Sequence, residues 1–239
     1  MQLLQEFDKI FRMEHLPVKL LPYEVLPLSH ESGIIEFVKD AITIDELKRK
    51  GCSLKTLLSG SKRRKKNFMN TLVGYSLVTY FLQVKDRHNG NIMVKSDGSI
   101  FHIDYGFFMT NLPGKGVELE KNLPFKLTAE YVDALGGTES KKFQEFRLLF
   151  YKAFNACRKH QHKIIILAKL MYSSFGKTMP CFVKGKESIE QLEERFNPAG
   201  VTNEPGMSVY CQNLINSSID NWRSRWYDKW QYYMQGIFY

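Results

Sequence analysis

Asp86-Arg87-His88-Asn89-Gly90-Asn91, followed downstream by Asp104-Tyr105-Gly106, is the stretch of sequence that decides the fold. Residues 92–95 and 100–103, between the two motifs, have the composition of short strands, and Asp97-Gly98 is the dipeptide that a two-residue type I′ turn prefers. A hairpin closed by this turn places residue 91 opposite residue 104. The sequence therefore predicts that the side chains of Asn91 and Asp104 lie roughly 5 Å apart.

Oxygen ligands at this separation suit Mg²⁺ or the similar Mn²⁺. Protein kinases place a catalytic Asp five residues before a metal-binding Asn and a second metal-binding Asp further on. Asp86, Asn91 and Asp104 reproduce that order and the first spacing. An isolated Asp-Tyr-Gly is more often a turn than a metal site, but the combined pattern is specific. We therefore predict that Asn91 and Asp104 bind a divalent cation that bridges the phosphates of ATP.

Composition bounds the class of protein. The chain has 239 residues, of which 44% are apolar and 13% aromatic, which is enough for a packed core. Four cysteines are scattered without a C-x-x-C pair, so neither a disulfide framework nor a zinc site is predicted. No secretory signal opens the chain, and no run approaches the roughly 18 apolar residues of a membrane span. We therefore expect a soluble or peripheral protein in a reducing compartment.

The charge balance is basic. The formal net charge is +9, and residues 62–66, Lys-Arg-Arg-Lys-Lys, supply much of it. A solvated helix start explains this run, and so does attraction to an anionic membrane surface; both interpretations stay open. Nucleic acid binding is not predicted, because no aromatic residues alternate with the charges and no recognition motif accompanies them.

The order of elements predicts an α+β fold. Residues 1–15 have helical spacing of apolar residues, and residues 20–28 and 33–38 have the pattern of two strands. From residue 39 onward helices dominate. The predicted helices cover residues 45–50, 66–82, 129–135, 140–159, 163–172, 189–196 and about 207 to the end. We therefore divide the chain into a small two-strand unit, 1–38, and a large helical lobe, 39–239.

An aromatic stripe marks the last of these helices. Its members recur at steps of three and four residues: Ile219, Trp222, Trp226, Trp230, Tyr233 and Ile237. Basic residues lie beside it. Such a helix suits a membrane interface, so we expect peripheral membrane contact through Trp222, Trp226 and Trp230. Packing of the stripe on the large lobe explains the same pattern equally well.

The order Asp-Arg-His, in place of His-Arg-Asp, resembles the phosphoinositide 3-/4-kinase family. Residues 83–92 are most similar to its type III phosphatidylinositol 4-kinases, in particular the beta form. Further matches lie at residues 22–26, 124–128, 130–133, 136–137 and 192–196. The resemblance implies a protein-kinase-like large helical lobe with a truncated remnant of the small lobe at 1–38. The related giant protein kinases usually have Pro where Asn89 stands, which disfavours them.

The resemblance also assigns the nucleotide site. Residues 33–38 are similar to the strand and hinge that join kinase lobes, with Ile35 at the gatekeeper position. The backbone of Glu36 and Val38 would hold adenine, and Met93 and Ile103 would form the apolar floor beneath it. Strict strand alternation puts these last two residues on opposite faces of the hairpin, and a twist or bulge would reconcile this.

Two residues compete for the proton of the attacking hydroxyl. Asp86 would accept or orient it, whereas His88 could do the same or could bind the transferred phosphate as a cation. The sequence leaves this open, and it favours a structural role for Arg87. Residues 107–125 resemble the activation loop that contacts the lipid headgroup. This loop has only two basic residues, so plain phosphatidylinositol is the better-matched substrate.

The resemblance therefore predicts a phosphatidylinositol 4-kinase in the cytoplasm, peripheral on intracellular membranes of the Golgi type. Its substrates would be ATP and phosphatidylinositol, and the 4-position rests on the resemblance alone. No G-x-G-x-x-G occurs in the 239 residues. We therefore expect a fragment of an active kinase that turns over slowly by itself. A related protein kinase and a catalytically silent scaffold that binds membranes or partners are the alternatives.

Overall fold

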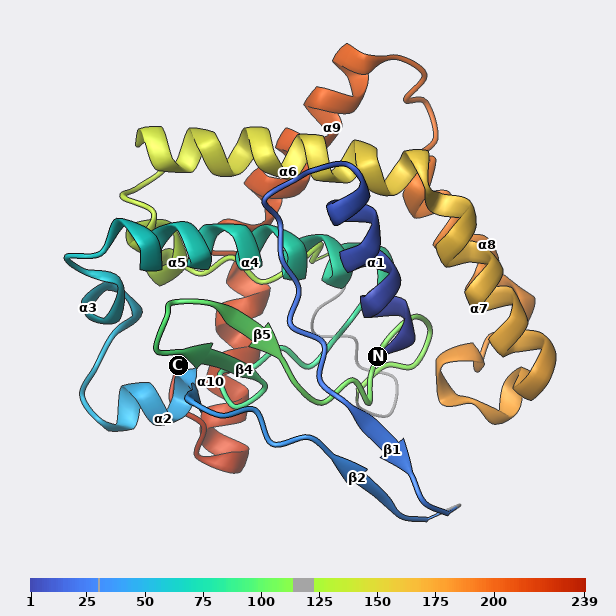
Figure 1. Cartoon of the computed structure of the whole chain (residues 1–239), viewed down its shortest axis with the longest axis horizontal. Coiled ribbons are helices and arrows are strands. Elements are labelled where there is room, and N and C mark those ends of the chain that lie inside the picture. The colour runs from blue at the N-terminus through green and yellow to red at the C-terminus, as the bar shows by residue number, and fades with distance from the viewer. Residues whose placement is uncertain (30, 114–122) are drawn as a thin grey trace.

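A long central helix, α4 (Lys62–Leu82), organises the molecule in a computed structural model, which describes residues 1–29, 31–113 and 123–239 (Figure 1). Ser61 caps the helix by accepting a hydrogen bond from the backbone N–H of Arg64 at 3.2 Å. From Phe68 to Leu82 every residue is buried, because α6 lies along one side and strand β5 along the other. The helix leads directly into the Asp86 motif, so that motif starts from the rigid core.

The other helices surround α4 (Figure 1). Their bounds are α1 (Gln2–Met13), α2 (Ile44–Arg49), α3 (Leu54–Leu58), α5 (Ala129–Ala134), α6 (Lys141–Lys159), α7 (Gln161–Phe175), α8 (Lys186–Phe196), α9 (Glu204–Ser218) and α10 (Trp222–Gln235). Two short 3-10 helices, η1 (Gly176–Thr178) and η2 (Pro180–Phe182), separate α7 from α8. The prediction of an α+β chain dominated by helices is confirmed.

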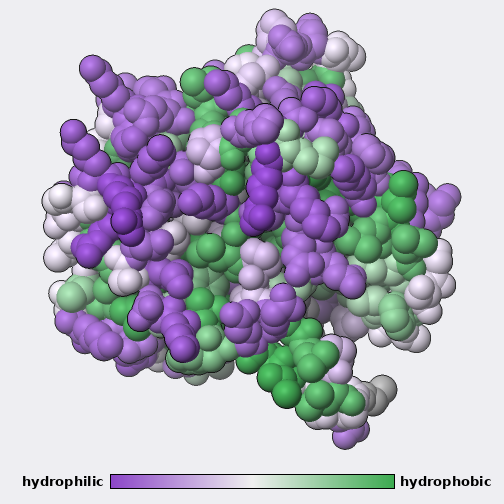
Figure 2. All heavy atoms as spheres, in the orientation of Figure 1, coloured by the Kyte–Doolittle hydropathy of each residue, from purple (hydrophilic) through white to green (hydrophobic). Residues whose placement is uncertain are grey.

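Two small sheets complete the fold. Strands β1 (Val25–Pro27) and β2 (Gly33–Ile35) form an antiparallel pair, and β3 (Ala41–Thr43), β4 (Ile92–Lys95) and β5 (Ile100–His102) form an antiparallel sheet in the order β3-β4-β5. The β1–β2 hairpin projects from the body, and Figure 2 shows apolar atoms gathered on it. Helix α1, by contrast, shares the hydrophobic core of the large lobe. The division at residue 38 stays a prediction.

The β4–β5 hairpin does not have the predicted two-residue turn. The N–H of Lys95 donates to the carbonyl of Ser99 at 2.8 Å, and the N–H of Gly98 donates to the carbonyl of Lys95 at 2.9 Å. These bonds close a three-residue loop in which Gly98 has φ +87° and forms a G1 bulge. Asn67 of α4 holds the loop through the carbonyl of Asp97 at 3.0 Å. The predicted turn is therefore wrong, because contacts with α4 select the longer loop.

The bulge shifts the register by one residue. Met93 pairs with Phe101, and Ile103 follows two positions later on the same face. Strict strand alternation predicts that Met93 and Ile103 lie on opposite faces of the hairpin. The structure has a bulge, which puts them on the same face. Asn91 now lies opposite Ile103, whose N–H donates to the Asn91 carbonyl at 3.1 Å, so it is offset by one residue from Asp104.

The C-terminal segment is two helices rather than one. The break falls at Asp220, which has φ +41°, and Asn221 caps α10 by accepting a hydrogen bond from the N–H of Arg223 at 2.9 Å. Ile219 and Ile237 lie outside α10, so the aromatic stripe on the helix is Trp222, Trp226, Trp230 and Tyr233. No helix in the described part of the chain is long and apolar enough to span a bilayer.

Candidate active site

A cavity of about 870 Å³ opens between the β1–β2 hairpin, the start of α1 and the β4–β5 hairpin. All five predicted nucleotide-binding residues line it: Ile35, Glu36, Val38, Met93 and Ile103. Asp104 lies at the same cavity. The floor is formed by the face that the bulge creates, because Met93, Phe101 and Ile103 point the same way. The cavity is thus apolar along its length, with a carboxylate where the floor ends, and its volume suits a nucleotide.

The chain between Ile35 and Val38 has the backbone groups that a purine needs. The N–H of Glu36 is taken, since it donates to the carbonyl of Glu24 at 2.9 Å. Within the described ranges, neither the carbonyl of Glu36 nor the N–H of Val38 has a hydrogen-bond partner. One acceptor and one donor therefore remain at the cavity edge, which is the pair that the exocyclic amine and a ring nitrogen of adenine require.

The segment that follows α4, residues 83–91, begins with two residues in the left-handed region. Gln83 ends α4 with φ +49°, and Asp86 has φ +63°. Non-glycine residues rarely adopt this conformation, and the surrounding contacts must over-determine it. Asp104 is the third such residue, with φ +54°. Two of the carboxylates that the sequence analysis singled out, Asp86 and Asp104, therefore lie on strained backbone.

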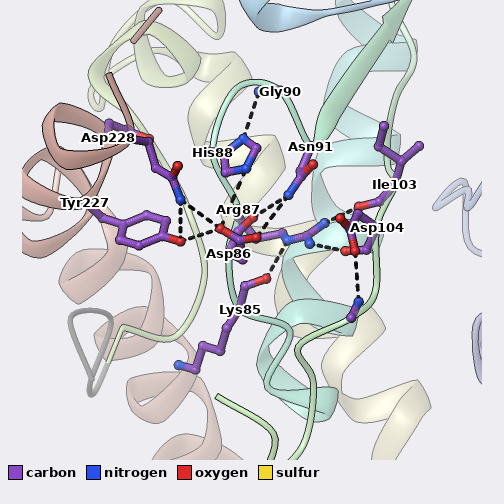
Figure 3. A network of polar contacts seen from close by, with 12 residues as sticks. Lys85, Asp86, Arg87, His88, Gly90, Asn91, Ile103, Asp104, Tyr227 and Asp228 are labelled. Carbon is purple, nitrogen blue, oxygen red and sulfur yellow. Dashed lines mark hydrogen bonds and ion pairs between the residues drawn. The ribbon is translucent and has the colours of Figure 1, made fainter. Parts of the chain in front are cut away.

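Arg87 ties the loop to the Asp104 turn (Figure 3). Only 2% of it is exposed, and its guanidinium donates to the carbonyls of Lys85 at 2.9 Å and Ile103 at 2.7 Å and to the carbonyl of Asp104. Its charge lies 5.6 Å from the centre of the Tyr105 ring. One side chain thus holds both motifs together, which agrees with the structural role expected for it.

Asn91 and Asp104 lie at the open end of the hairpin, where the N–H of Ile103, the residue before Asp104, donates to the Asn91 carbonyl (Figure 3). The amide nitrogen of Asn91 donates to the Asp86 carbonyl at 3.0 Å and to Asp86 Oδ2 at 3.4 Å, so the amide oxygen faces away from Asp86. Asp104 is exposed to the cavity, and its Oδ1 accepts the N–H of Gly106 at 3.1 Å. The described residues contain no cluster of three or more His, Cys, Asp or Glu that could hold a metal. A hard ion with two protein oxygens, completed by phosphate and water, fits this donor set.

His88 is oriented for one tautomer. Its Nδ1 accepts the N–H of Gly90 at 3.1 Å, so in the neutral ring the proton is on Nε2, which lies 3.7 Å from Asp86 Oδ1. Burial lowers the pKa of His88 below its ordinary value, although the Asp86 carboxylate acts in the opposite direction. The neutral ring therefore presents a donor to Asp86 and has no acceptor nitrogen for a substrate proton.

Helix α10 supplies residues that the sequence analysis missed. The hydroxyl of Tyr227 donates to Asp86 Oδ1 (Figure 3). Gln231 Nε2 donates to the same oxygen at 3.1 Å. One residue along, Asp228 forms a buried ion pair with Lys126 at 2.6 Å. The three α10 residues form a polar face of the helix, away from the Trp stripe. The helical spacing of these three polar residues is visible in the sequence, but the spacing alone does not show which face of the helix packs against the protein.

Comparisons with known proteins agree on one family. Residues 58–175 match the family model described as phosphatidylinositol 3- and 4-kinase. The chain is 43% identical to a phosphatidylinositol 4-kinase of Dictyostelium discoideum, 38% to phosphatidylinositol 4-kinase beta 1 of Arabidopsis thaliana and 34% to phosphatidylinositol 4-kinase beta of Danio rerio. Each similarity covers 99% of this chain and, in the same order, 21%, 22% and 29% of the relative. The chain thus spans less than a third of these relatives.

Proposed function

The chain belongs to the phosphatidylinositol 3- and 4-kinase family, and on that premise we propose that it carries the catalytic centre of a phosphatidylinositol 4-kinase. The γ-phosphoryl group of ATP would pass to the inositol 4-hydroxyl of phosphatidylinositol. The hydroxyl oxygen forms the new bond to phosphorus, the bond to the β-phosphate oxygen breaks, and the hydroxyl proton goes to a base. The choice of the 4-hydroxyl rests on the names of the relatives.

The observation that carries this proposal is the shared cavity. Adenine would lie against the Glu36 and Val38 backbone and over Met93 and Ile103, which all line the cavity, and the triphosphate would extend toward Asp104. Asn91 and Asp104 would hold Mg²⁺ or Mn²⁺, which when bound supplies charge neutralisation on the phosphates. The residues of the chain do the rest by positioning, because phosphoryl transfer leaves little covalent work to the protein.

Asp86 is the residue that we assign to the hydroxyl proton. Its carboxylate is held by donors from three sides, and a carboxylate so held can orient a hydroxyl and accept its proton. His88 is the weaker candidate, because its Nδ1 is occupied by Gly90 and its Nε2 carries a proton toward Asp86. The lowered pKa also disfavours a cationic His88 that binds phosphate. We assign His88 to holding Asp86 in place.

We further propose that the chain alone turns over slowly. Among the described residues, none that lines the cavity is lysine or arginine. The negative charge of the triphosphate would therefore be offset chiefly by the metal ion. In enzymes, removal of one group that stabilises the charge of the transition state typically lowers the rate by about two to three orders of magnitude.

A transfer assay tests the proposal. The full chain is incubated with labelled ATP, Mg²⁺, phosphatidylinositol vesicles and a protein substrate, and the products are separated. We expect label in phosphatidylinositol 4-phosphate, and we expect Asp86→Asn and Asp104→Asn to reduce it at least ~100-fold. Asp97→Asn is the control, because the Asp97 side chain accepts the N–H of Ser99 in the hairpin loop, which an asparagine side chain can also do. Label in the protein substrate would support the alternative of a related protein kinase. Absence of label from both lipid and protein would support a catalytically silent scaffold.

Peripheral membrane contact is part of the proposal. Trp222, Trp226 and Trp230 are 59%, 52% and 38% exposed, so they are not the face by which α10 packs. Residues 62–66 are also exposed, and their charge would add attraction to an anionic leaflet. The cytoplasmic face of a Golgi-type membrane stays the proposed location.

Vesicle binding tests this contact. Trp222→Ala with Trp226→Ala should weaken binding to phosphatidylinositol-containing vesicles by about tenfold or more, because two interfacial anchors are lost. Trp230 is left intact, since its ring stacks on Tyr227 with centroids 5.8 Å apart. Ile166→Ala with Leu170→Ala removes equally exposed apolar side chains from α7 and is the matched control. Equal binding by both double variants would contradict the contact.

A further inference from the structure

The inner face of α10 is polar, which is unusual for the buried side of an amphipathic helix. Four positions at helical spacing are buried on it: Ser224, Tyr227, Asp228 and Gln231. This face meets the Asp86 motif and the start of α5 rather than the apolar core. A buried polar face is costly unless its groups are satisfied, so its contacts indicate what the helix does.

The direction of each hydrogen bond can be assigned. Gln231 Nε2 donates to the Tyr227 hydroxyl oxygen at 2.7 Å, so that oxygen acts as an acceptor there. The Tyr227 hydroxyl proton is then directed to Asp86 Oδ1, and Gln231 Nε2 donates to the same oxygen at 3.1 Å. Two donors from one helix therefore converge on a single oxygen of the carboxylate that we assign to the hydroxyl proton.

The other oxygen of that carboxylate points elsewhere. Asp86 Oδ2 accepts a hydrogen bond from the amide nitrogen of Asn91 at 3.4 Å. The backbone of Asp86 is in the left-handed region, which surrounding contacts must stabilise. The two bonds that α10 makes to Oδ1 therefore help to fix the orientation of the carboxylate, together with Asn91 and His88.

We propose that Tyr227 and Gln231 are positioning residues for phosphoryl transfer: they fix the Asp86 carboxylate so that it meets the substrate hydroxyl. This inference rests on the proposed function. Neither residue lines the nucleotide cavity, so they act on the rate of transfer and not on ATP binding. We place their effect on the rate in the orientation of the Asp86 carboxylate.

Contacts other than those of Tyr227 also hold α10 in its position. Lys126 and Asp228 are both buried and form an ion pair at 2.6 Å, which attaches the helix beside the loop. The backbone carbonyl of Phe238, just after the helix, accepts a hydrogen bond from Asn89 at 2.9 Å. Removal of the Tyr227 hydroxyl should therefore leave the helix in place and weaken the hold on Asp86.

Tyr227→Phe tests the proposal, because it removes the hydroxyl and keeps the ring stacked on Trp230. We expect kcat for lipid phosphorylation to fall about 10- to 100-fold, with KM for ATP, KM for phosphatidylinositol vesicles and Tm unchanged. Gln231→Met is the second variant: we expect a smaller fall in kcat, again with both KM values and Tm unchanged. Tyr151→Phe on α6 is the control, and its kcat should equal that of the parent chain.

Three results would overturn the proposal. The first is an unchanged kcat in both variants. The second is a higher kcat, which would mean that α10 restrains Asp86. The third is a fall in kcat together with a raised KM or a lowered Tm, which would mean that the two residues only support packing. Failure of the proposed function is a separate outcome, since the unaltered chain would then give no labelled lipid at all.

Discussion

Replacing Arg87 by methionine should destabilise the fold, because this one side chain holds two motifs together. Its guanidinium donates to three backbone carbonyls, of Lys85, Ile103 and Asp104, and methionine leaves all three without that donor. Each bond from a charged donor contributes about 1.5–3 kcal/mol, and relief from burying the charge offsets part of the total. We expect a loss of about 3–5 kcal/mol, a large share of the ~5–15 kcal/mol that stabilises a typical domain.

Urea unfolding followed by circular dichroism measures this loss, and thermal unfolding should show a Tm roughly 10 °C lower. Arg87→Lys should lose nearly as much, because a compact ammonium cannot reach three carbonyls at once. Arg63→Met is the control: this residue is exposed on the first turn of α4, and the expected change is within about 0.5 kcal/mol. A loss below about 1 kcal/mol for Arg87→Met would refute the role given to this residue.

Two further predictions concern the hairpin. Gly98→Ala should lower the free energy of unfolding by about 2 kcal/mol or more, because the new Cβ would lie 2.6 Å from the Arg64 carbonyl oxygen and because φ is +87°. Gly200→Ala is the control: it has φ +77° but open space around it, so it should lose only about 1 kcal/mol in the same unfolding assay. Equal losses in the two variants would refute the clash. Burial lowers the pKa of His102 well below 6.5, so the unfolded chain binds a proton there that the folded chain does not. The contribution of His102 to the free energy of unfolding is therefore present above pH 6.5 and falls by about 1.4 kcal/mol between pH 7.5 and 5.5. The same dependence of stability on pH in His102→Phe would contradict this.

Much of the site could be predicted from the sequence because its parts are local. The hinge residues, the hairpin and the spacing from Asp86 to Asn91 depend on short stretches of chain, and the cavity gathers the residues expected for nucleotide binding. The exact register could not be predicted. An Asp-Gly dipeptide suits a two-residue turn, but Asn67 and the backbone of α4 select a three-residue loop by contacts that are distant in sequence.

The role of the C-terminal helix was also beyond the sequence. Its aromatic stripe could face a membrane or the protein, and the pattern alone does not decide between them. Only the docking of α10 shows that the polar face packs and that Tyr227 and Gln231 reach Asp86, more than 140 residues away. The sequence also did not predict the break at Asp220, because a tertiary contact stabilises it. The N–H of Asp220 donates to the carbonyl of Leu127 at 2.8 Å instead of continuing the hydrogen bonds of α9.

Diffraction from crystals grown with Mn²⁺ and a non-hydrolysable ATP analogue tests the central claim most directly. Anomalous scattering locates the ion independently of the protein. We predict a peak at about 2 Å from the Asn91 amide oxygen and from an Asp104 carboxylate oxygen, with adenine against the backbone of Glu36 and Val38. Nucleotide in the cavity with the ion bound elsewhere, or nucleotide bound outside the cavity, would contradict the account.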